Sequence, residues 1–254
     1  MTINSIPPEN APTRWVAISS TNRWKLFDQQ VGTSSAAISS MTYLVKPGSV
    51  NSMAILGANA SEVSMSLVIP STGEIVFSSF IDLTSNTTIG DWLKYFYEPV
   101  YTQEAVTVTN LLDIAQMSIP GYGEAVLAVT LKKPNSIVSA GVLVVGQSVD
   151  IGHTQTAPTI GIIDYSKKDI DPFGNPYIIV RNYSKRVSAK VMFNSALTDN
   201  INQILAQYRS TPLVWVGAEN LYSSLIVYGF YRDYDITIDN VIMSSCNLTI
   251  EGLT

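Results

Sequence analysis

The residue types that most often carry out catalysis are scarce in this chain. It contains one histidine, His153, in a stretch rich in threonine and proline, and one cysteine, Cys246, in an alternating apolar run. A lone histidine supplies neither a metal site nor an acid–base relay. No strained turn or helix start near Cys246 would activate its thiol. We therefore interpret Cys246 as a small buried apolar residue and His153 as an exposed linker residue.

Sequence motifs of the common enzyme classes are also missing. The chain lacks a Gly-x-Ser-x-Gly nucleophile turn, the Walker A loop that binds nucleotide phosphates, and the Gly-x-Gly-x-x-Gly fingerprint of dinucleotide-binding folds. These patterns mark large groups of hydrolases, nucleotide-binding enzymes and dehydrogenases. We therefore expect no enzyme, with no catalytic residue and no cofactor.

Acidic and aromatic side chains lie close together in residues 82–104, a mixture that suits sugar binding. Four carboxylates of this segment offer the acid pair that a glycosidase needs: Asp82, Asp91, Glu98 and Glu104. Four aromatic rings form a candidate glycan site: Trp92, Tyr95, Tyr97 and Tyr101. We favour the other interpretation, in which the helical spacing of Trp92, Tyr95 and Phe96 places these rings in a core.

Two groups of aspartates are candidates, one for binding a metal ion and the other for protecting the edge of a sheet. Asp164, Asp169 and Asp171 offer oxygen ligands for Ca²⁺, but their spacing lacks the glycine and terminal glutamate of an EF-hand loop. We expect turns stabilised by aspartate there, and no metal. In a predicted strand over 233–239, three aspartates and Thr237 alternate on one face. That face is either simply exposed to solvent, or it protects an edge strand from wrong pairing before assembly.

Composition indicates a protein that works inside an assembly. Charged residues make up 14% of the chain and apolar residues 46%, whereas an ordinary soluble domain has about 25% charged residues. A surface so poor in charge is weakly protected from association, so we expect neighbours to cover part of it. The net charge of −5 and the lack of long Lys/Arg clusters argue against nucleic-acid binding.

The sequence contains no targeting or membrane signal. No apolar stretch approaches the length of a membrane helix, so we expect no membrane insertion. The first residues lack the basic and apolar regions of a secretory signal peptide. We expect a chain that is made in a cytoplasm and becomes part of something larger.

Short β-branched or alternating runs predict a mostly β fold. In residues 1–150 the predicted strands are 39–45, 52–56, 61–69, 74–83, 106–114, 124–131 and 137–147. Turn residues separate them at 47–48, 71–73, 120–121 and 133–135. This pattern predicts an N-terminal antiparallel β-sandwich.

After a predicted linker over residues 151–174, the pattern changes to a smaller C-terminal α+β domain over 175–254. Its predicted strands are 177–181, 186–193, 213–216, 224–228, 235–238 and 245–250. A helix is predicted over 198–209, because Ile201, Ile204, Leu205 and Tyr208 share one face, with Thr198 or Asp199 as its N-cap.

The segment 14–28 and the following Gly-Thr step resemble the opening of phage tail proteins that carry a galactose-binding-like jelly roll. Seven residues match that pattern: Asn22, Arg23, Trp24, Phe27, Asp28, Gly32 and Thr33. The resemblance extends over roughly residues 12–150, including the strands around 55–57. Shorter segments farther on are also similar to such tail proteins: 175–177, 181–186, 209–217, 228–229 and 245–253.

The resemblance implies a structural subunit of a phage tail tip or baseplate, assembled in the host cytoplasm and located in the virion. We expect its partners to be other tail proteins and copies of itself, with Arg181, Lys185 and Arg186 as candidate partner-binding residues that could pair with carboxylates. Their other interpretation is solvated strand ends. The alternative function is binding of a host-surface glycan or receptor through the jelly-roll loops.

Overall fold

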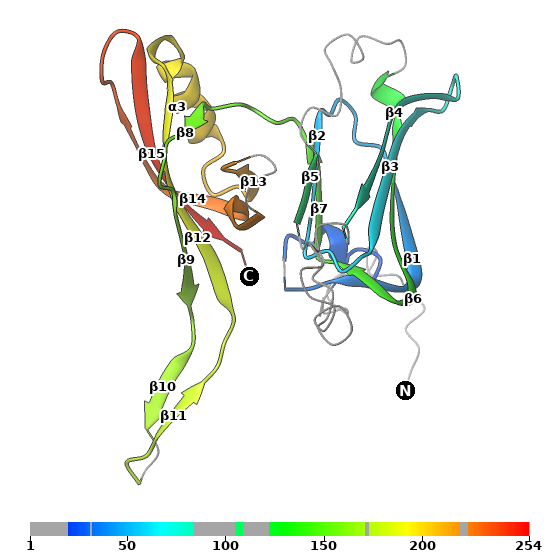
Figure 1. Cartoon of the computed structure of the whole chain (residues 1–254), viewed down its shortest axis with the longest axis horizontal. Helices are drawn as coiled ribbons and strands as arrows, with labels where there is room; N and C mark the ends of the chain where they lie inside the picture. Colours follow the sequence, from blue (N-terminus) through cyan, green and yellow to red (C-terminus); the bar gives the residue numbers. More distant parts are fainter. Residues whose placement is uncertain are drawn as a thin grey trace, which may run out of the picture.

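The computed structural model describes residues 20–30, 32–83, 105–108, 122–170, 173–218 and 223–253. Within them the chain is mostly β, as predicted, and all paired strands are antiparallel. Figure 1 shows an N-terminal half, β1 to β7, beside a C-terminal half, β8 to β15 with α3. One crossing segment joins the two halves between β7 and β8.

One sheet of the N-terminal half has the order β1-β6-β3-β4. Its strands are β1 (Ser35–Val45), β3 (Glu62–Ile69), β4 (Glu74–Asp82) and β6 (Val126–Ala140). In β3 every second side chain is buried, from Val63 to Ile69, and those between are only partly covered. This period of two is what a strand with one face on a core requires.

A second sheet, of order β5-β2-β7, closes the core from the other side. Its strands are β2 (Ser52–Leu56), β5 (Ala105–Val108) and β7 (Val142–Gly146). Ile55 and Leu143 of this sheet share one hydrophobic cluster with Met65 and Leu131 of the first. Two short 3-10 turns, η3 (Lys25–Phe27) and η4 (Tyr122–Glu124), each add one buried side chain. The N-terminal half is therefore two antiparallel sheets over one core.

Two predicted strand limits in this half are wrong. The turn expected at 133–135 does not end a strand, because β1 pairs with β6 both before and after it. Residues on both strands bulge there, and Ser39 and Asn135 adopt positive φ angles of 64° and 58°. The predicted strand 137–147 divides at Gly141, because its first part pairs with β1 and its second part with β2.

The main sheet of the C-terminal half, called here the C-terminal sheet, has the order β13-β14-β15-β12-β8, and β9 also pairs with β12. Its strands are β8 (His153–Thr154), β9 (Thr159–Asp164), β12 (Tyr183–Asn194), β13 (Leu213–Val216), β14 (Ile226–Thr237) and β15 (Met243–Gly252). Two further strands, β10 (Lys167–Ile170) and β11 (Pro176–Ile179), pair with each other. A 3-10 turn, η6 (Ser223–Leu225), precedes β14.

The predicted helix is confirmed as α3 (Thr198–Gln207), which follows the 3-10 turn η5 (Ser195–Leu197). Ile201 and Leu205 are buried on one face of α3 and pack against Phe193 and Cys246 of the sheet. Burial of this apolar stripe is what stabilises so short a helix.

Two expectations for the C-terminal half, the helix cap and the strands 224–228 and 235–238, are wrong. Thr198 or Asp199 was predicted to cap the start of the helix, but the 3-10 turn η5 comes before it. The capping side chain is Asn194 at the start of η5, which accepts a hydrogen bond from the N–H of Ala196 (2.9 Å). The predicted strands 224–228 and 235–238 are one strand, β14, since β15 pairs with it from Gly229 to Thr237. The predicted linker 151–174 contains β8, β9 and β10, which form ladders with β12 and β11.

The two halves pack against each other through apolar side chains. Leu56 and Val142 of the N-terminal half share a buried cluster with Ile226 and Tyr228 of β14. Such a contact favours a defined arrangement of the halves. The expected boundaries of the domains stay a prediction.

Candidate protein-docking surface

A two-stranded ribbon, residues 159–188, projects from the C-terminal half. It consists of β9 with the first part of β12, continued by β10 and β11. Figure 1 shows it extending well beyond the rest of the C-terminal sheet. Two strands alone cannot cover both of their faces, and an isolated pair is only marginally stable in water.

Large apolar side chains of the ribbon are exposed. The most exposed are Phe173 (89%), Val180 (82%) and Ile178 (70%). Others along its length are also at least 45% exposed: Ile160, Ile162, Tyr165, Ile170, Tyr177 and Tyr183. Single exposed apolar residues are ordinary, but a row of them along one projecting element marks a contact surface.

The ribbon is fixed to the sheet at its root. The hydroxyl of Tyr165 lies 3.0 Å from the hydroxyl of Ser184, which is buried, and donates to Glu251 Oε1 at 3.1 Å. Asp164 accepts a hydrogen bond from the N–H of Ser166 (2.8 Å). Hydrogen bonds from Ser166 lower the pKa of the Asp164 carboxyl. These contacts set the direction in which the ribbon leaves the sheet.

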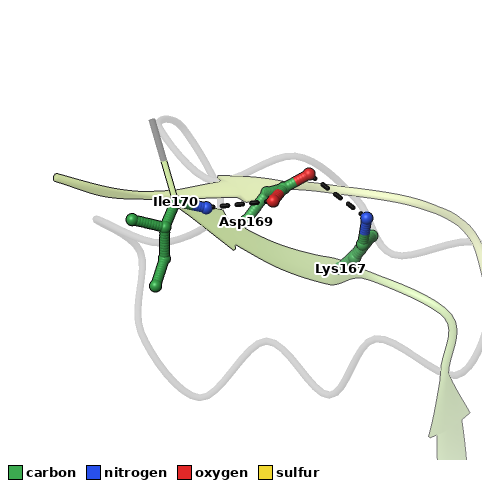
Figure 2. A network of polar contacts seen from close by, with 3 residues as sticks. All are labelled: Lys167, Asp169 and Ile170. Atoms are coloured by element: carbon green, nitrogen blue, oxygen red, sulfur yellow. Dashed lines mark hydrogen bonds and ion pairs between the residues drawn. The ribbon is translucent and has the colours of Figure 1, made fainter. Parts of the chain in front are cut away.

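The aspartates that could have suggested a Ca²⁺ site have local structural roles in the ribbon. Figure 2 shows Asp169 pairing with Lys167 (3.2 Å) while its other oxygen accepts from the N–H of Ile170 (3.0 Å), whose side chain points away from the pair. Asp171 lies outside the described residues. Among the described residues, no cluster of three or more histidine, cysteine or carboxylate groups is arranged to hold a metal.

The three predicted partner-binding cations all lie in the ribbon and are exposed, but they do not form one patch. Lys185 and Arg186 are neighbours on β12, so they point to opposite faces. Arg181 lies before β12, and its backbone N–H donates to Ser166 Oγ (3.0 Å). Within the described chain none of the three forms an ion pair. They remain available to carboxylates of a partner.

The predicted glycan-binding residues Trp92, Tyr95, Tyr97 and Tyr101 lie outside the described residues. The exposed apolar residues of the ribbon were not among the predicted site residues. Their signal in the sequence is the apolar content of 160–163 and 177–180 beside glycine and proline. When these runs are interpreted as buried strands, their exposure is not predicted.

A shallow crevice between the halves is a second candidate site. It has a volume of about 330 Å³, with Phe27, Val45, Val144, Pro212 and Tyr228 among its lining residues. Burial, and secondarily the charge of Asp28, raises the pKa of the Tyr228 hydroxyl. Its described lining offers no carboxylate, imidazole or thiol, so we regard it as the seam between the halves.

Comparison with known proteins adds no family. Neither a protein-family model nor a curated protein sequence matches the chain. Among the described helices, none has the length and apolar character of a membrane span. The resemblance to phage tail proteins therefore stays a prediction.

The residues that carry that resemblance have structural roles here. The Asn22 side chain accepts a hydrogen bond from the N–H of Ala36 in β1 (2.9 Å) and donates one to the carbonyl of the same residue (2.8 Å). Asp28 accepts a hydrogen bond from the Thr33 hydroxyl (2.8 Å). The Trp24 ring is 62% exposed and contacts Phe27, whereas Leu26 between them is buried.

The thiol of Cys246 is expected to be unreactive in the folded protein. The side chain is 2% exposed, and burial, with a smaller effect of Asp235, raises its pKa from 9.0 to about 11. At pH 8 about one thiol in a thousand is then ionised. A chromogenic disulfide reagent should react with Cys246 at least about a hundredfold more slowly than with free cysteine, and at the ordinary rate in denaturant.

The same pKa shift makes the stability of the folded protein depend on pH in a definite direction. Because the folded pKa lies above the unfolded one, the folded state holds its proton more tightly between pH 9 and about 11. The stability contributed by the neutral thiol is complete below pH 9 and is lost as the pH rises toward 11. Fast labelling at pH 8 without denaturant would contradict this description of Cys246.

Proposed function

We propose that this chain is a non-catalytic structural subunit that docks on neighbouring proteins of a larger particle through its ribbon. The observation that carries the proposal is the row of exposed apolar side chains on a projecting element that the chain's own core does not cover. Following the resemblance, the particle is a phage tail, at its tip or baseplate.

Physical reasons favour an occupied ribbon. Each apolar square ångström removed from water stabilises a contact by roughly 25 cal/mol. A two-stranded ribbon also gains order when a third element covers it. A partner would therefore gain affinity from the exposed isoleucines, while Arg181, Lys185 and Arg186 would set its orientation.

The N-terminal half is proposed to be the decorating or spacing part of the subunit. Its two antiparallel sheets over one core are compatible with the jelly roll that the resemblance implies. The buried cluster that includes Leu56 and Tyr228 ties this half to the C-terminal half. Docking of the ribbon would thus position both halves together.

The proposal is tested by replacing Ile170 and Ile178 with serine. Both side chains are exposed, so the isolated protein should keep its melting temperature within a few degrees. Incorporation into tail particles, measured by immunoblot of purified particles, should fall by about tenfold or more because the docking contact is lost.

The chain offers a matched control for this experiment. Ile38 and Ile137 are paired directly across β1 and β6 and are also exposed, but they lie far from the ribbon in the N-terminal half. Serine at these two positions should leave incorporation unchanged. Normal incorporation of the ribbon variant, or an equal loss in both variants, would remove the ribbon from the proposal.

A further inference from the structure

The two ends of the C-terminal sheet carry opposite charge. At one end the ribbon has five cations (Lys167, Lys168, Arg181, Lys185, Arg186) against three carboxylates (Asp164, Asp169, Asp171). At the other end the far parts of β14 and β15 with their connection, residues 232–248 and here called the acidic hairpin, have three carboxylates (Asp233, Asp235, Asp239) against one cation, Arg232. A positive element thus stands opposite a negative one on a chain of net charge −5.

The acidic hairpin also has exposed apolar residues at its tip. Val241 is 94% exposed, Ile242 69% and Ile238 68%. Asp233, Asp235 and Thr237 alternate on an exposed face of β14, as the sequence predicts, but β14 ends at Thr237 and does not include the predicted Asp239. The hairpin therefore combines the same two properties as the ribbon, apolar area and charge, with the sign of the charge reversed.

Both elements leave a strand edge open. Within the described residues, β13 pairs with β14 only over Ile226 to Gly229, so the outer edge of β14 beyond Gly229 has no ladder partner. On the opposite side of the sheet, β9 pairs with β12 alone. Open edges offer backbone N–H and C=O groups to another strand, and heterologous contacts between unlike surfaces join copies head to tail.

The projecting part of the ribbon and the tip of the acidic hairpin lie at opposite ends of the sheet. Strand β12 connects them, pairing with β9 near the ribbon and with the tip of the hairpin where Asn194 faces Met243. From Arg186 to Asn194 the strand covers about 27 Å. Figure 1 shows the ribbon and the β14–β15 tip pointing away from each other. Contact between them therefore requires a second copy.

We propose that the ribbon of one copy docks on the acidic hairpin of a second copy, so that the chain forms head-to-tail oligomers. The inference rests on the proposed function and names its partner and its two surfaces. Contact between two ribbons would bring like charges together, whereas ribbon on hairpin joins opposite charges and covers apolar area on both sides.

The test uses two charge-reversed forms of the full chain. The ribbon variant is Lys168→Glu with Lys185→Glu, and the hairpin variant is Asp233→Lys with Asp235→Lys; all four side chains are exposed. Sedimentation of the wild type should show concentration-dependent oligomers that weaken with salt. Each variant alone should self-associate at least about tenfold more weakly than the wild type. An equimolar mixture of the two variants should regain oligomers because the reversed surfaces complement each other.

Two results would overturn the inference. A hairpin variant that assembles like the wild type would show that the hairpin is not the ribbon's partner. A wild type that stays monomeric at every concentration would exclude self-docking, and the incorporation of the Ile170/Ile178 variant would then decide separately whether the ribbon binds another protein. If charge reversal unfolds a variant, glutamine or asparagine at the same positions should still weaken assembly.

Discussion

Replacing Gly229 with alanine is expected to disrupt the C-terminal sheet. A Cβ atom at this position would lie 2.0 Å from the carbonyl oxygen of Glu251 and 2.7 Å from the Cα of Gly252. Both are backbone atoms of β15, so no side-chain rotation relieves the clash. Gly229 pairs with Leu213 on one side and with Gly252 on the other, so separating the strands would break both ladders. We expect a loss of at least about 3 kcal/mol in the free energy of unfolding.

Urea unfolding followed by circular dichroism measures this loss, and Gly146→Ala is the matched control. Gly146 lies at the end of β7, where an added Cβ meets nothing within 4 Å. The control should stay within about 0.5 kcal/mol of the wild type. Equal stability of the two variants would mean that β14 and β15 do not approach as closely as described.

Replacing Leu131 with alanine is expected to be similarly damaging to the N-terminal half. Leu131 is fully buried in β6 and lies between Met41 of β1 and Val63 of β3, in the cluster that the two sheets share. Removing its side chain costs transfer free energy and leaves a cavity, together about 2–5 kcal/mol. The melting temperature should fall markedly.

Leu44→Ala provides the comparison for this substitution. Leu44 belongs to β1 of the same sheet but is exposed on its outer face. The same change of side chain there should alter the free energy of unfolding by less than about 0.5 kcal/mol. A loss at Leu44 as large as at Leu131 would contradict the assignment of inner and outer faces.

Local patterns predicted the regular elements well. Strand β2 and strand β13 have the predicted limits, and α3 begins at the predicted Thr198. Alternation in β3 and helical spacing in α3 are local consequences of burying one face, so a sequence pattern reveals them.

The features that escaped prediction depend on distant partners. The Pro-Asn pair at 134–135 indicates a turn locally, but β1 holds the chain in one ladder across it. Residues 177–180 have the apolar content of a buried strand, and only the absence of a covering layer leaves them exposed. The sequence therefore nominated candidate docking residues by their charge, at Arg181, Lys185 and Arg186, and did not nominate the exposed apolar residues that we propose to contact a partner.

Strand β12 gives the subunit a mechanical property. Its first part belongs to the ribbon, and its register with β15 continues without a shift from Arg186 to Asn194. Antiparallel hydrogen bonds lie perpendicular to the strands. A pull on the ribbon along its length would therefore load these bonds together, in shear, instead of opening them one after another. A contact made at the ribbon would transmit tension directly into the body of the sheet, as a tether between moving parts requires.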